Sequence, residues 1–408
     1  MIQRHQLECV SCNTSIVTRF GVGHGSKQVH AFPCPKCGIP ITCVMRLDQE
    51  KAGVAFDPPI NGRWVEVSSA FPAPVFVTFH PEILEHKSAF QQDGASPFVT
   101  AAHQFADYRE FAAHEGERMR IRKNLWEAVK RAEVHFERDQ WDLWEKEIRD
   151  LLDTEPAKEY EGRLKQMFIC HDYSVRLFTL DRHDIWSIGD EQFKAATFTH
   201  HRELGAFLDL IRTSGRSLSL WRQMNALHDE FISTYHIWMP VLQLQYWKDR
   251  PTNIKDLMVS DKRFEEMKPL YLNAFEFFAR LSVIALGVTL IRGNGSSDVP
   301  TKKGSMSIWD FERLENANKI PHLEKYVGTQ HFAALMDTKL RNGIGHNAAH
   351  YDVATDEIVC LRTREAALEE WRISYTEFCY TMLELVSATF FSEVFLRETL
   401  RLTGGLNP

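Results

Sequence analysis

Two closely spaced pairs of cysteines constrain the amino-terminal part of this chain more than any other feature. Twenty-one residues separate the pairs, which read Cys9-Val-Ser-Cys12 and Cys34-Pro-Lys-Cys37. A two-residue spacer lets one tight turn present both sulfur atoms to a single ion. Asn13 and Gly38 follow the second cysteine of each pair, and these residue types best tolerate the positive φ that such turns often require. The spacing therefore predicts two turns that share one tetrahedral ion.

The cysteine pattern resembles the zinc ribbon over about residues 5–45. It predicts a structural Zn²⁺ bound by all four thiolates, a shell that leaves no open position for catalysis. The predicted ligands are Cys9, Cys12, Cys34 and Cys37. Two alternatives are unrelated reduced thiols and a thioredoxin-like redox motif, although no βαβ pattern surrounds the pairs. His24 and His30 lie between the pairs, and we expect them to be exposed loop residues rather than ligands.

Turn-forming residues divide the next part of the chain into short β-favouring runs, such as residues 64–67 and 75–79. Residues 91–97 read as a linker. Beyond about residue 100, apolar residues recur every three or four positions, which predicts helices. We therefore expect a mainly α fold in four domains. They are a zinc ribbon (1–50), a small β region with a linker (51–100), a helical middle region (101–255) and a carboxy-terminal helical bundle (256–408).

The helical part divides further by its pattern. One helix is predicted over residues 121–152, and residues 193–247 form a helical segment that Pro240 kinks or splits. Residues 153–192 are ambiguous, with a possible strand at 174–186. Residues 270–291 are apolar almost all round, which places their helix inside a bundle.

The carboxy-terminal region is expected to contain two more helices and a small hairpin. In the apolar helix, Glu276 and Arg280 are spaced to form an ion pair. The later helices are predicted at about residues 324–341 and 363–402. Between them, residues 351–362 read as a hairpin that turns at 354–356.

Charge and hydropathy limit the classes of partner. The chain has 48 basic and 55 acidic residues, a net charge of −7, so a nucleic-acid site has to be local rather than spread over the surface. Residues 281–291 are the longest uncharged apolar stretch, and a bilayer needs about 20 residues. The start of the chain lacks an apolar signal segment. We expect a cytoplasmic protein without a membrane partner.

Residues 339–352 hold three groups with complementary chemistry. His346 can exchange a proton near neutral pH, Arg341 can hold phosphate oxygens, and Asn342 can orient either group. Asn342 and His346 share a helix face, whereas Arg341 lies about 140° from His346 on an ideal helix. Gly343 and Gly345 weaken the helix, which predicts that the motif sits at a helix end. Such groups can split an RNA phosphodiester without metal, the histidine deprotonating the ribose 2′-OH.

The Arg341-Asn342-x-x-x-His346 signature, following apolar helices, resembles the HEPN domain over about residues 260–402. The resemblance implies a metal-independent ribonuclease fold with Arg341, Asn342 and His346 as catalytic residues. It also implies a homodimer, in which the second copy brings another motif to the site. Many members act in toxin, abortive-infection or CRISPR systems, so a defence setting and a regulatory or antitoxin partner are implied as well.

We therefore expect an endoribonuclease whose amino-terminal ribbon recognises the RNA target or restrains activity. The alternative is a non-enzymatic scaffold that binds nucleic acid or protein and dimerises through its bundle. In that case Arg341, Asn342 and His346 cap a helix end. The two hypotheses differ in exposure, because an enzyme needs Arg341 and His346 accessible, whereas a scaffold buries them in local hydrogen bonds.

Overall fold

The computed structural model combines β-sheets near the amino terminus with a largely helical remainder, and 57% of it is helical. The structure describes residues 2–48, 53–66, 75–87, 103–153, 170, 173–174, 176–177, 183–249, 251, 253–364 and 367–403. The predicted linker at 91–97 lies outside these residues. The predicted order, β structure first and helices afterwards, is confirmed at this coarse level.

The chain forms two compact units, each built from three separate stretches of sequence. Unit 1 contains Met1–Ala112, Thr234–Pro269 and Asn342–Leu383. Unit 2 contains Ala113–Ser233, Leu270–Arg341 and Glu384–Pro408. The residues that make up one unit are therefore distant in the sequence.

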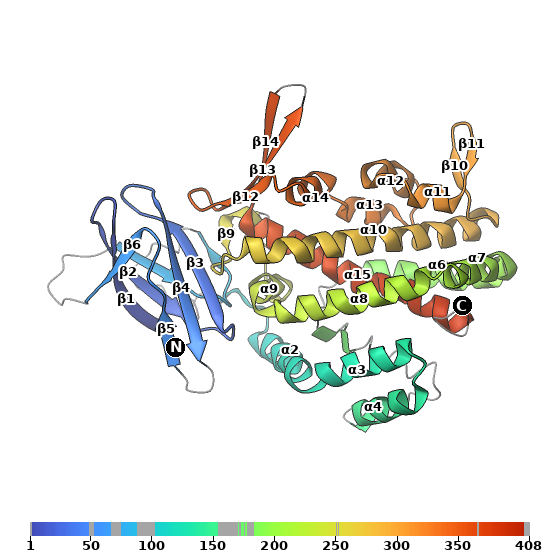
Figure 1. Cartoon of the computed structure of the whole chain (residues 1–408), viewed down its shortest axis with the longest axis horizontal. Coiled ribbons are helices and arrows are strands. Elements are labelled where there is room, and N and C mark those ends of the chain that lie inside the picture. The colour runs from blue at the N-terminus through green and yellow to red at the C-terminus, as the bar shows by residue number, and fades with distance from the viewer. Residues whose placement is uncertain are drawn as a thin grey trace. The chain divides into compact units, whose positions relative to one another are not determined.

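Two sheets form the amino-terminal part of unit 1 (Figure 1), and their strands pair in antiparallel fashion except for the parallel pair β2–β7. The first has the strand order β6-β1-β2-β7, and the second has the order β3-β4-β5. The strands are β1 (Ile2–Cys9), β2 (Ser15–Gly21), β3 (Lys27–Pro33), β4 (Pro40–Asp48), β5 (Gly53–Phe56), β6 (Gly62–Val65) and β7 (Val75–Phe79). Both β-favouring runs predicted at 64–67 and 75–79 contain strand residues, and Val67 lies outside the described residues.

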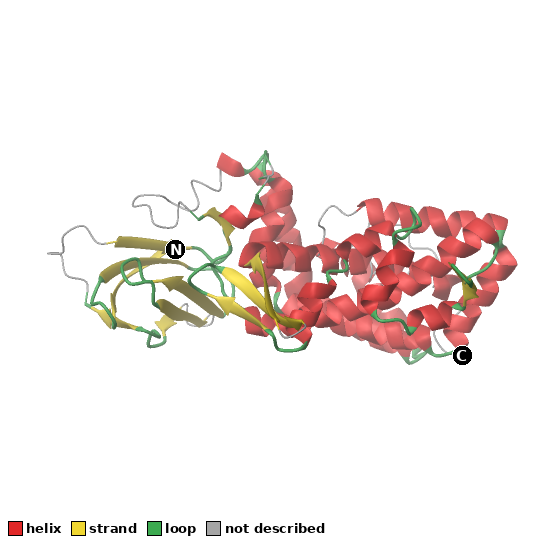
Figure 2. Ribbon diagram, turned by 90° about the horizontal axis from the view of Figure 1, so that it is seen from above, coloured by secondary structure: helices red, strands yellow, loops and turns green. Residues whose placement is uncertain are grey.

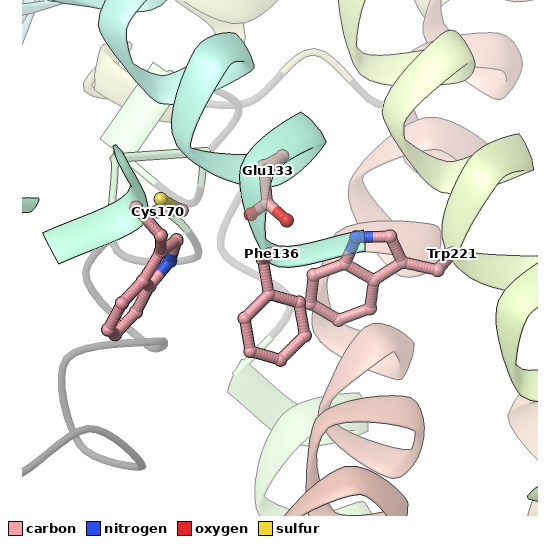
Figure 3. A pocket seen from close by; sticks show the side chains of 5 residues that line it. Glu133, Phe136, Cys170 and Trp221 are labelled. Carbon is pink, nitrogen blue, oxygen red and sulfur yellow. The ribbon is translucent and has the colours of Figure 1, made fainter. Parts of the chain in front are cut away.

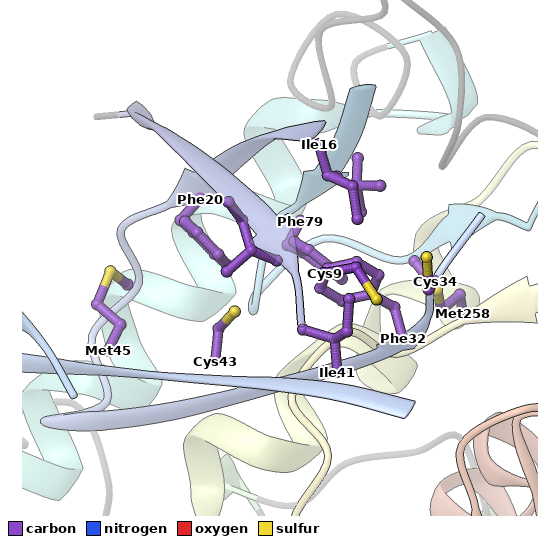
Figure 4. Close-up of a cluster of buried hydrophobic side chains, with 12 residues drawn as sticks. Cys9, Ile16, Phe20, Phe32, Cys34, Ile41, Cys43, Met45, Phe79 and Met258 are labelled. Atoms are coloured by element: carbon purple, nitrogen blue, oxygen red, sulfur yellow. The ribbon is translucent and has the colours of Figure 1, made fainter. Parts of the chain in front are cut away.

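Apolar side chains from both sheets form a common core (Figure 4). Phe20 and Phe79 stack with their ring centres 5.5 Å apart, and Phe32 lies 5.3 Å from Phe79. Cys9 and Cys34 belong to the same cluster, so the cysteine pairs are anchored in the core rather than on free loops. Burial of this apolar surface stabilises the packing of the two sheets.

His30 is part of this core, which corrects the expectation that it is an exposed loop residue. It points inward from β3, is fully buried, and lies 5.2 Å from Phe20 and 4.9 Å from Phe79 between ring centres. The alternation of side chains along a strand places it there. Burial lowers the pKa of His30 to about 3, because the charged imidazolium is disfavoured away from water. His24 differs, since its side chain is 55% exposed and pairs with Glu82 at 2.7 Å.

A buried run of charges, Asp261 to Arg263, joins the three stretches of unit 1. The Asp261 carboxylate accepts a hydrogen bond from the backbone N–H of Val29 on β3 at 3.0 Å and pairs with Arg263 at 2.8 Å. The Lys262 backbone N–H donates to the Val29 carbonyl at 2.7 Å, and its ammonium pairs with Asp356. These contacts connect the amino-terminal strands with both later stretches of the unit.

The remaining parts of unit 1 are short strands and helices. The elements are β8 (Glu85–His86), α9 (Tyr235–Leu242), the 3₁₀ helices η2 (Gln243–Tyr246) and η3 (Ile254–Asp256), β9 (Leu257–Met258), β12 (Ala349–Asp352), β13 (Glu357–Arg364) and β14 (Ala367–Ser374). Strand β8 pairs with β9, and β12, β13 and β14 form one antiparallel sheet. Pro240 lies inside α9.

The predicted hairpin at residues 351–362 is confirmed, because β12 and β13 are antiparallel and joined through Asp356 at φ 57°. The helix predicted from residue 363 is wrong at its start. Strand β14 occupies Ala367–Ser374, and helix α15 begins only at Tyr375. Pairing of β14 with β13 along eight residues accounts for the difference, since ladder hydrogen bonds override a local helical pattern.

Unit 2 is mainly helical, and its long helices lie side by side in both views (Figures 1 and 2). The helices that lie within it or enter it are α2 (Tyr108–Arg120), the π-helix η1 (Ile121–Leu125), α3 (Trp126–Glu137), α4 (Trp141–Asp153), α6 (His183–Thr199), α7 (His201–Thr213), α8 (Arg216–Ser233), α10 (Phe264–Asn294), α11 (Ile308–Glu312), α12 (Asn316–Leu323), α13 (Gln330–Leu335), α14 (Thr338–Gly345) and α15 (Tyr375–Thr403). Strands β10 (Val299–Thr301) and β11 (Gly304–Met306) form a small hairpin.

Several helix boundaries differ from the sequence predictions. The single helix predicted over 121–152 is interrupted, because Asp139 adopts φ 53° between α3 and α4. The helix predicted at 324–341 is instead divided between α13 and α14. In the ambiguous stretch, the described residues of 174–186 are helical. Local periodicity indicates a helix, but a single left-handed residue is enough to end one.

Within the part of the chain that the structure describes, two helices are long and apolar enough to cross a membrane, judged by length and composition. They are Phe264–Asn294 and Tyr375–Arg397, and 83% and 80% of their most apolar windows are buried inside the fold. Such burial is typical of the core helices of globular domains, which pass the same test.

The buried neutral His30 predicts a specific loss of stability in acid. The unfolded chain takes up a proton at His30 near pH 6.5, whereas the folded chain does so only near pH 3, so stability falls as the pH drops below 6.5. Between pH 7 and pH 5, wild type should lose about 2 kcal/mol more than a His30→Phe variant. Urea unfolding at the two pH values measures this difference. An equal loss in both proteins would show that His30 is protonated in the fold.

Candidate functional site

The two cysteine pairs lie in turns of the same backbone geometry. Cys9 ends β1, and the N–H of Asn13 donates to its carbonyl at 2.9 Å. In the second turn, the N–H of Gly38 donates to the carbonyl of Cys34, also at 2.9 Å. Asn13 has φ 54° and Gly38 has φ 76°, which confirms the positive φ that the sequence predicts at both positions. Each turn closes around the backbone of its first cysteine and directs both sulfurs to one side.

The four sulfur atoms come together as one cluster, all within 4.8 Å of one another. The sulfurs of Cys9 and Cys37 are 3.7 Å apart, and those of Cys12 and Cys34 are 3.6 Å apart. A tetrahedral Zn²⁺ with Zn–S bonds of about 2.3 Å places its sulfurs about 3.8 Å apart. The cluster therefore matches the size of a zinc–tetrathiolate shell and could hold a structural metal such as zinc.

Two cysteines of the cluster have pKa values shifted in opposite directions. The Thr14 hydroxyl, 3.1 Å from the Cys12 sulfur, is the main reason that the pKa of Cys12 is lowered to about 6. Burial raises the pKa of Cys34 to about 11, because it disfavours a charged thiolate. A bound cation would supply the positive charge that stabilises the buried thiolate. Cys37 is exposed, so the cluster is reachable from solvent on that side.

Helix α14 carries the second candidate site at its carboxy-terminal end, as predicted. The Asp337 carboxylate caps its start by accepting from the N–H groups of Lys339 and Leu340 at 2.9 and 3.0 Å. The helix ends at Gly345, and Asn347 follows with φ 53°. A positive φ just beyond the last turn is a usual way to terminate a helix.

Asn342 and His346 are exposed and lie one turn apart at this helix end. The N–H of His346 donates to the carbonyl of Asn342 at 3.0 Å, which keeps the last turn intact. Gly343 between them packs against β13: a Cβ at this position would lie 2.8 Å from the sulfur of Cys360. Glycine is required there because the helix approaches the strand closely.

Arg341 belongs to unit 2, and the division between the units runs between it and Asn342. Its guanidinium donates through Nε and Nη2 to the same oxygen, Oε1 of Glu276 on α10, at 2.9 and 2.6 Å. The side chains of Arg341 and Glu276 are 30% and 42% exposed. The sequence predicts pairing of Glu276 with Arg280, whereas in the structure Glu276 pairs with Arg341.

Glu276 was not predicted as a site residue, although one signal in the sequence marks it. It is one of the few charges in an otherwise apolar helix, and such a charge has to find a partner. Its partner is 65 residues away along the chain. Helical spacing alone points to Arg280, one turn away, as the partner of Glu276. It cannot indicate Arg341, which folding brings close.

A small pocket in unit 2 also contains ionisable groups (Figure 3). Its lining residues are Glu133, Phe136, Trp144, Cys170 and Trp221. Arg397 pairs with Glu133 at 3.2 Å and lies 4.8 Å from the ring centre of Trp221. The space does not admit a water molecule. This pocket is therefore part of a packed core that contains an ion pair, not a ligand site.

Comparison with protein families, curated proteins and solved structures finds no match to this chain. The candidate sites are therefore judged on their geometry and chemistry.

The cysteine cluster predicts a stoichiometric metal. Elemental analysis of the purified protein should find about one zinc per chain, because one tetrathiolate shell binds one ion. Cys34→Ser should lose this zinc and lower the midpoint of thermal unfolding, since binding free energy contributes to folding. Cys43→Ala removes a buried thiol of the same core that is outside the cluster, and should keep the zinc. Zinc retained in Cys34→Ser, or missing from the folded wild type, would contradict the assignment.

Proposed function

We propose that this protein is a metal-independent endoribonuclease of HEPN type, with a structural zinc site in its amino-terminal sheets. The observation that carries the proposal is the exposure of Asn342 and His346 at the end of α14, next in sequence to an arginine whose guanidinium is held by a carboxylate. These groups supply a base, a polar orienting group and a cation. No metal ion is needed for that chemistry.

In the proposed reaction, His346 removes the proton of a ribose 2′-OH, and the oxygen attacks the adjacent phosphorus. The bond from phosphorus to the 5′ oxygen breaks, which leaves a 2′,3′-cyclic phosphate and a 5′-hydroxyl. Arg341 stabilises the additional negative charge on the phosphoryl oxygens. Asn342 orients the histidine or the phosphate. The leaving 5′ oxygen needs a proton, which the histidine of a second copy supplies in a homodimer.

Glu276 has a positioning role in this proposal. It fixes the guanidinium of Arg341 through two hydrogen bonds to one oxygen, so less conformational entropy is lost when phosphate binds. The same carboxylate repels the anionic substrate. Glu276 therefore has two opposing effects: it orients Arg341 for phosphate binding, and it weakens the attraction of the site for phosphate. Replacement of Glu276 therefore changes substrate affinity and turnover together.

The cellular setting follows from the HEPN resemblance and not from a contact in the structure. The resemblance implies that the substrate is RNA, that the protein acts in the cytoplasm as a toxin or in anti-phage defence, and that a regulatory or antitoxin partner controls it. The zinc site would hold the amino-terminal sheets in a shape that recognises the target or restrains activity.

One observation favours the alternative of a non-enzymatic scaffold. The pair of Arg341 with Glu276 satisfies the guanidinium without any ligand, as a structural pair between helices would. In that case the bundle serves dimerisation, and Arg341 contributes to stability rather than to cleavage. Activity and stability of the same variants separate the two functions.

The ribonuclease proposal predicts RNA cleavage that persists in EDTA. Arg341→Ala and His346→Ala should each reduce the rate by about 100-fold or more, the usual loss for a transition-state cation or a general base. His350→Ala, an exposed histidine four residues further on, is the matched control and should cut normally. Gel analysis of a labelled RNA measures the rates, and thermal unfolding checks that all variants fold.

The chemistry of the products provides a second readout. An RNA with 2′-O-methyl groups at the cleaved positions should remain intact, because the attacking hydroxyl is blocked. Equal cutting of RNA by wild type and both variants would indicate another site or a contaminant. If the folded wild type does not cut RNA while Arg341→Ala loses stability, the scaffold function is favoured instead.

A further inference from the structure

Strand β14 leaves one edge of its sheet open. The sheet has the order β12-β13-β14, and all eight residues of β14 pair with β13 in a long hairpin (Figure 1). Among the described residues, no strand pairs with the other edge of β14. Such an edge presents a row of backbone N–H and C=O groups with which a further strand can pair. Many proteins recruit an extended segment in this way.

The charges along β14 determine which segment fits beside it. Glu369 and Glu370 come first, and Arg372 follows after Trp371, so the strand is acidic and then basic. The side chains of Glu370 and Arg372 are 45% and 39% exposed and pair with each other, and Arg372 also pairs with Glu357 on β13 at 3.0 Å. An antiparallel second copy of β14 would place its basic end beside the acidic end of the first. The edge is therefore complementary in charge to itself.

One register of two antiparallel β14 strands satisfies these charges. Two copies of a strand pair in this way about a two-fold axis perpendicular to the sheet, so one residue lies opposite its own copy. An axis at Glu369, Glu370 or Arg372 places like charges directly opposite each other, which is destabilising. An axis at Trp371 places Glu370 of each copy opposite Arg372 of the other and brings the two indole rings together. Opposite charges and paired aromatic rings both stabilise neighbouring strands.

We infer that β14 is the dimerisation strand of this protein, and that its open edge pairs with β14 of a second copy in the register centred on Trp371. The two three-stranded sheets then form one continuous sheet of six strands. Both copies use the same surface, so the contact closes after two chains and forms a dimer rather than a fibre.

The end of α14 is attached to the same sheet. Trp371 lies directly opposite Cys360 on β13, and side chains of opposite residues point to the same face. A Cβ on Gly343 of α14 would lie 2.8 Å from the Cys360 sulfur, so α14 packs on this face. The end of α14, which His346 directly follows, therefore lies on the face to which Trp371 points.

The proposed axis places both α14 ends on one face of the joint sheet. The two β13 strands are then three strand spacings apart, about 14 Å, with the tryptophans between them. This arrangement gives the site its second histidine. That link rests on the proposed ribonuclease function, in which His346 of a second copy protonates the leaving oxygen, whereas the interface itself rests on β14 alone.

Two variants of opposite charge test the interface. Glu370→Lys and Arg372→Glu each turn both symmetric pairs from attraction into repulsion, so sedimentation equilibrium should show a dimer Kd about 30-fold above that of dimeric wild type. An equimolar mixture of the two variants should form a heterodimer, because both pairs are then complementary again. Glu369→Lys makes the same charge change at the neighbouring position, which lies opposite Ile373 in this register. It is the matched control and should dimerise like wild type.

The opposite results are equally clear. A wild type that is monomeric at micromolar concentration would overturn the inference, as would variants that dimerise as tightly as wild type or that stay apart when mixed. Dimerisation that none of these changes affects would place the contact on another surface.

Crosslinking tests the register even if a charge variant does not fold. In a Cys360→Ala background, Trp371→Cys should form an intermolecular disulfide with diamide as oxidant, because a residue on the axis lies about 5 Å from its own copy, within disulfide range. Glu369→Cys in the same background lies about 14 Å from its copy and should crosslink no more than the parent. Equal crosslinking at the two positions would contradict the register.

RNA cleavage tests the link to the site separately. Glu370→Lys should lose cleavage together with the dimer, and mixing with Arg372→Glu should restore both. A wild type that dimerises through β14 without cutting RNA would contradict the ribonuclease proposal and leave the interface standing. A monomeric Glu370→Lys that cuts at the wild-type rate would overturn the link.

Discussion

The buried ion pairs of Asp261, Lys262 and Arg263 are the interaction on which unit 1 depends. Taking three charges out of water is expensive, and the cost is recovered only where every charge meets a partner. Here the partners come from different stretches: the Val29 N–H near the amino terminus binds the Asp261 carboxylate, and Asp356 in the third stretch pairs with Lys262. The Tyr375 hydroxyl, also in the third stretch, accepts from the backbone N–H of Arg263 at 2.9 Å and donates to the backbone carbonyl of Asp261 at 3.0 Å. The charges therefore favour this arrangement of the three stretches, because another would separate Lys262 from Asp356 and the Asp261 carboxylate from the Val29 N–H.

The two candidate sites use this framework differently. The cysteine cluster is local, since the β1–β2 turn of one sheet and the β3–β4 turn of the other each contribute two of the four sulfurs, and its anchoring in the core would couple metal binding to folding. The end of α14 is less self-contained. Gly343 fixes the helix against β13, while the orientation of Arg341 comes from Glu276 on α10. The first site could hold a structural metal, and the second presents exposed polar side chains at the end of a helix.

The sequence predicts the features that depend on neighbouring residues. The cysteine spacing, the positive φ at Asn13 and Gly38, and the β12–β13 hairpin all arise within a few positions, so pattern and turn chemistry are sufficient. Prediction from the sequence fails where contacts between segments that are distant along the chain determine the structure. Strand β14 forms because β13 pairs with it, and Glu276 meets Arg341 across 65 residues. The burial of His30 depends likewise on packing between two sheets. A residue pattern cannot show which far segment will become a neighbour.

The three-stretch composition of unit 1 has a consequence for synthesis on the ribosome. Its amino-terminal strands emerge early, but Asp356 and Tyr375, the partners of the buried charges, are translated more than 300 residues after Val29. The unit cannot close cotranslationally until its third stretch, Asn342–Leu383, has left the exit tunnel. Until then the edges of the early strands lack their late partners, and unpaired strand edges are prone to premature association.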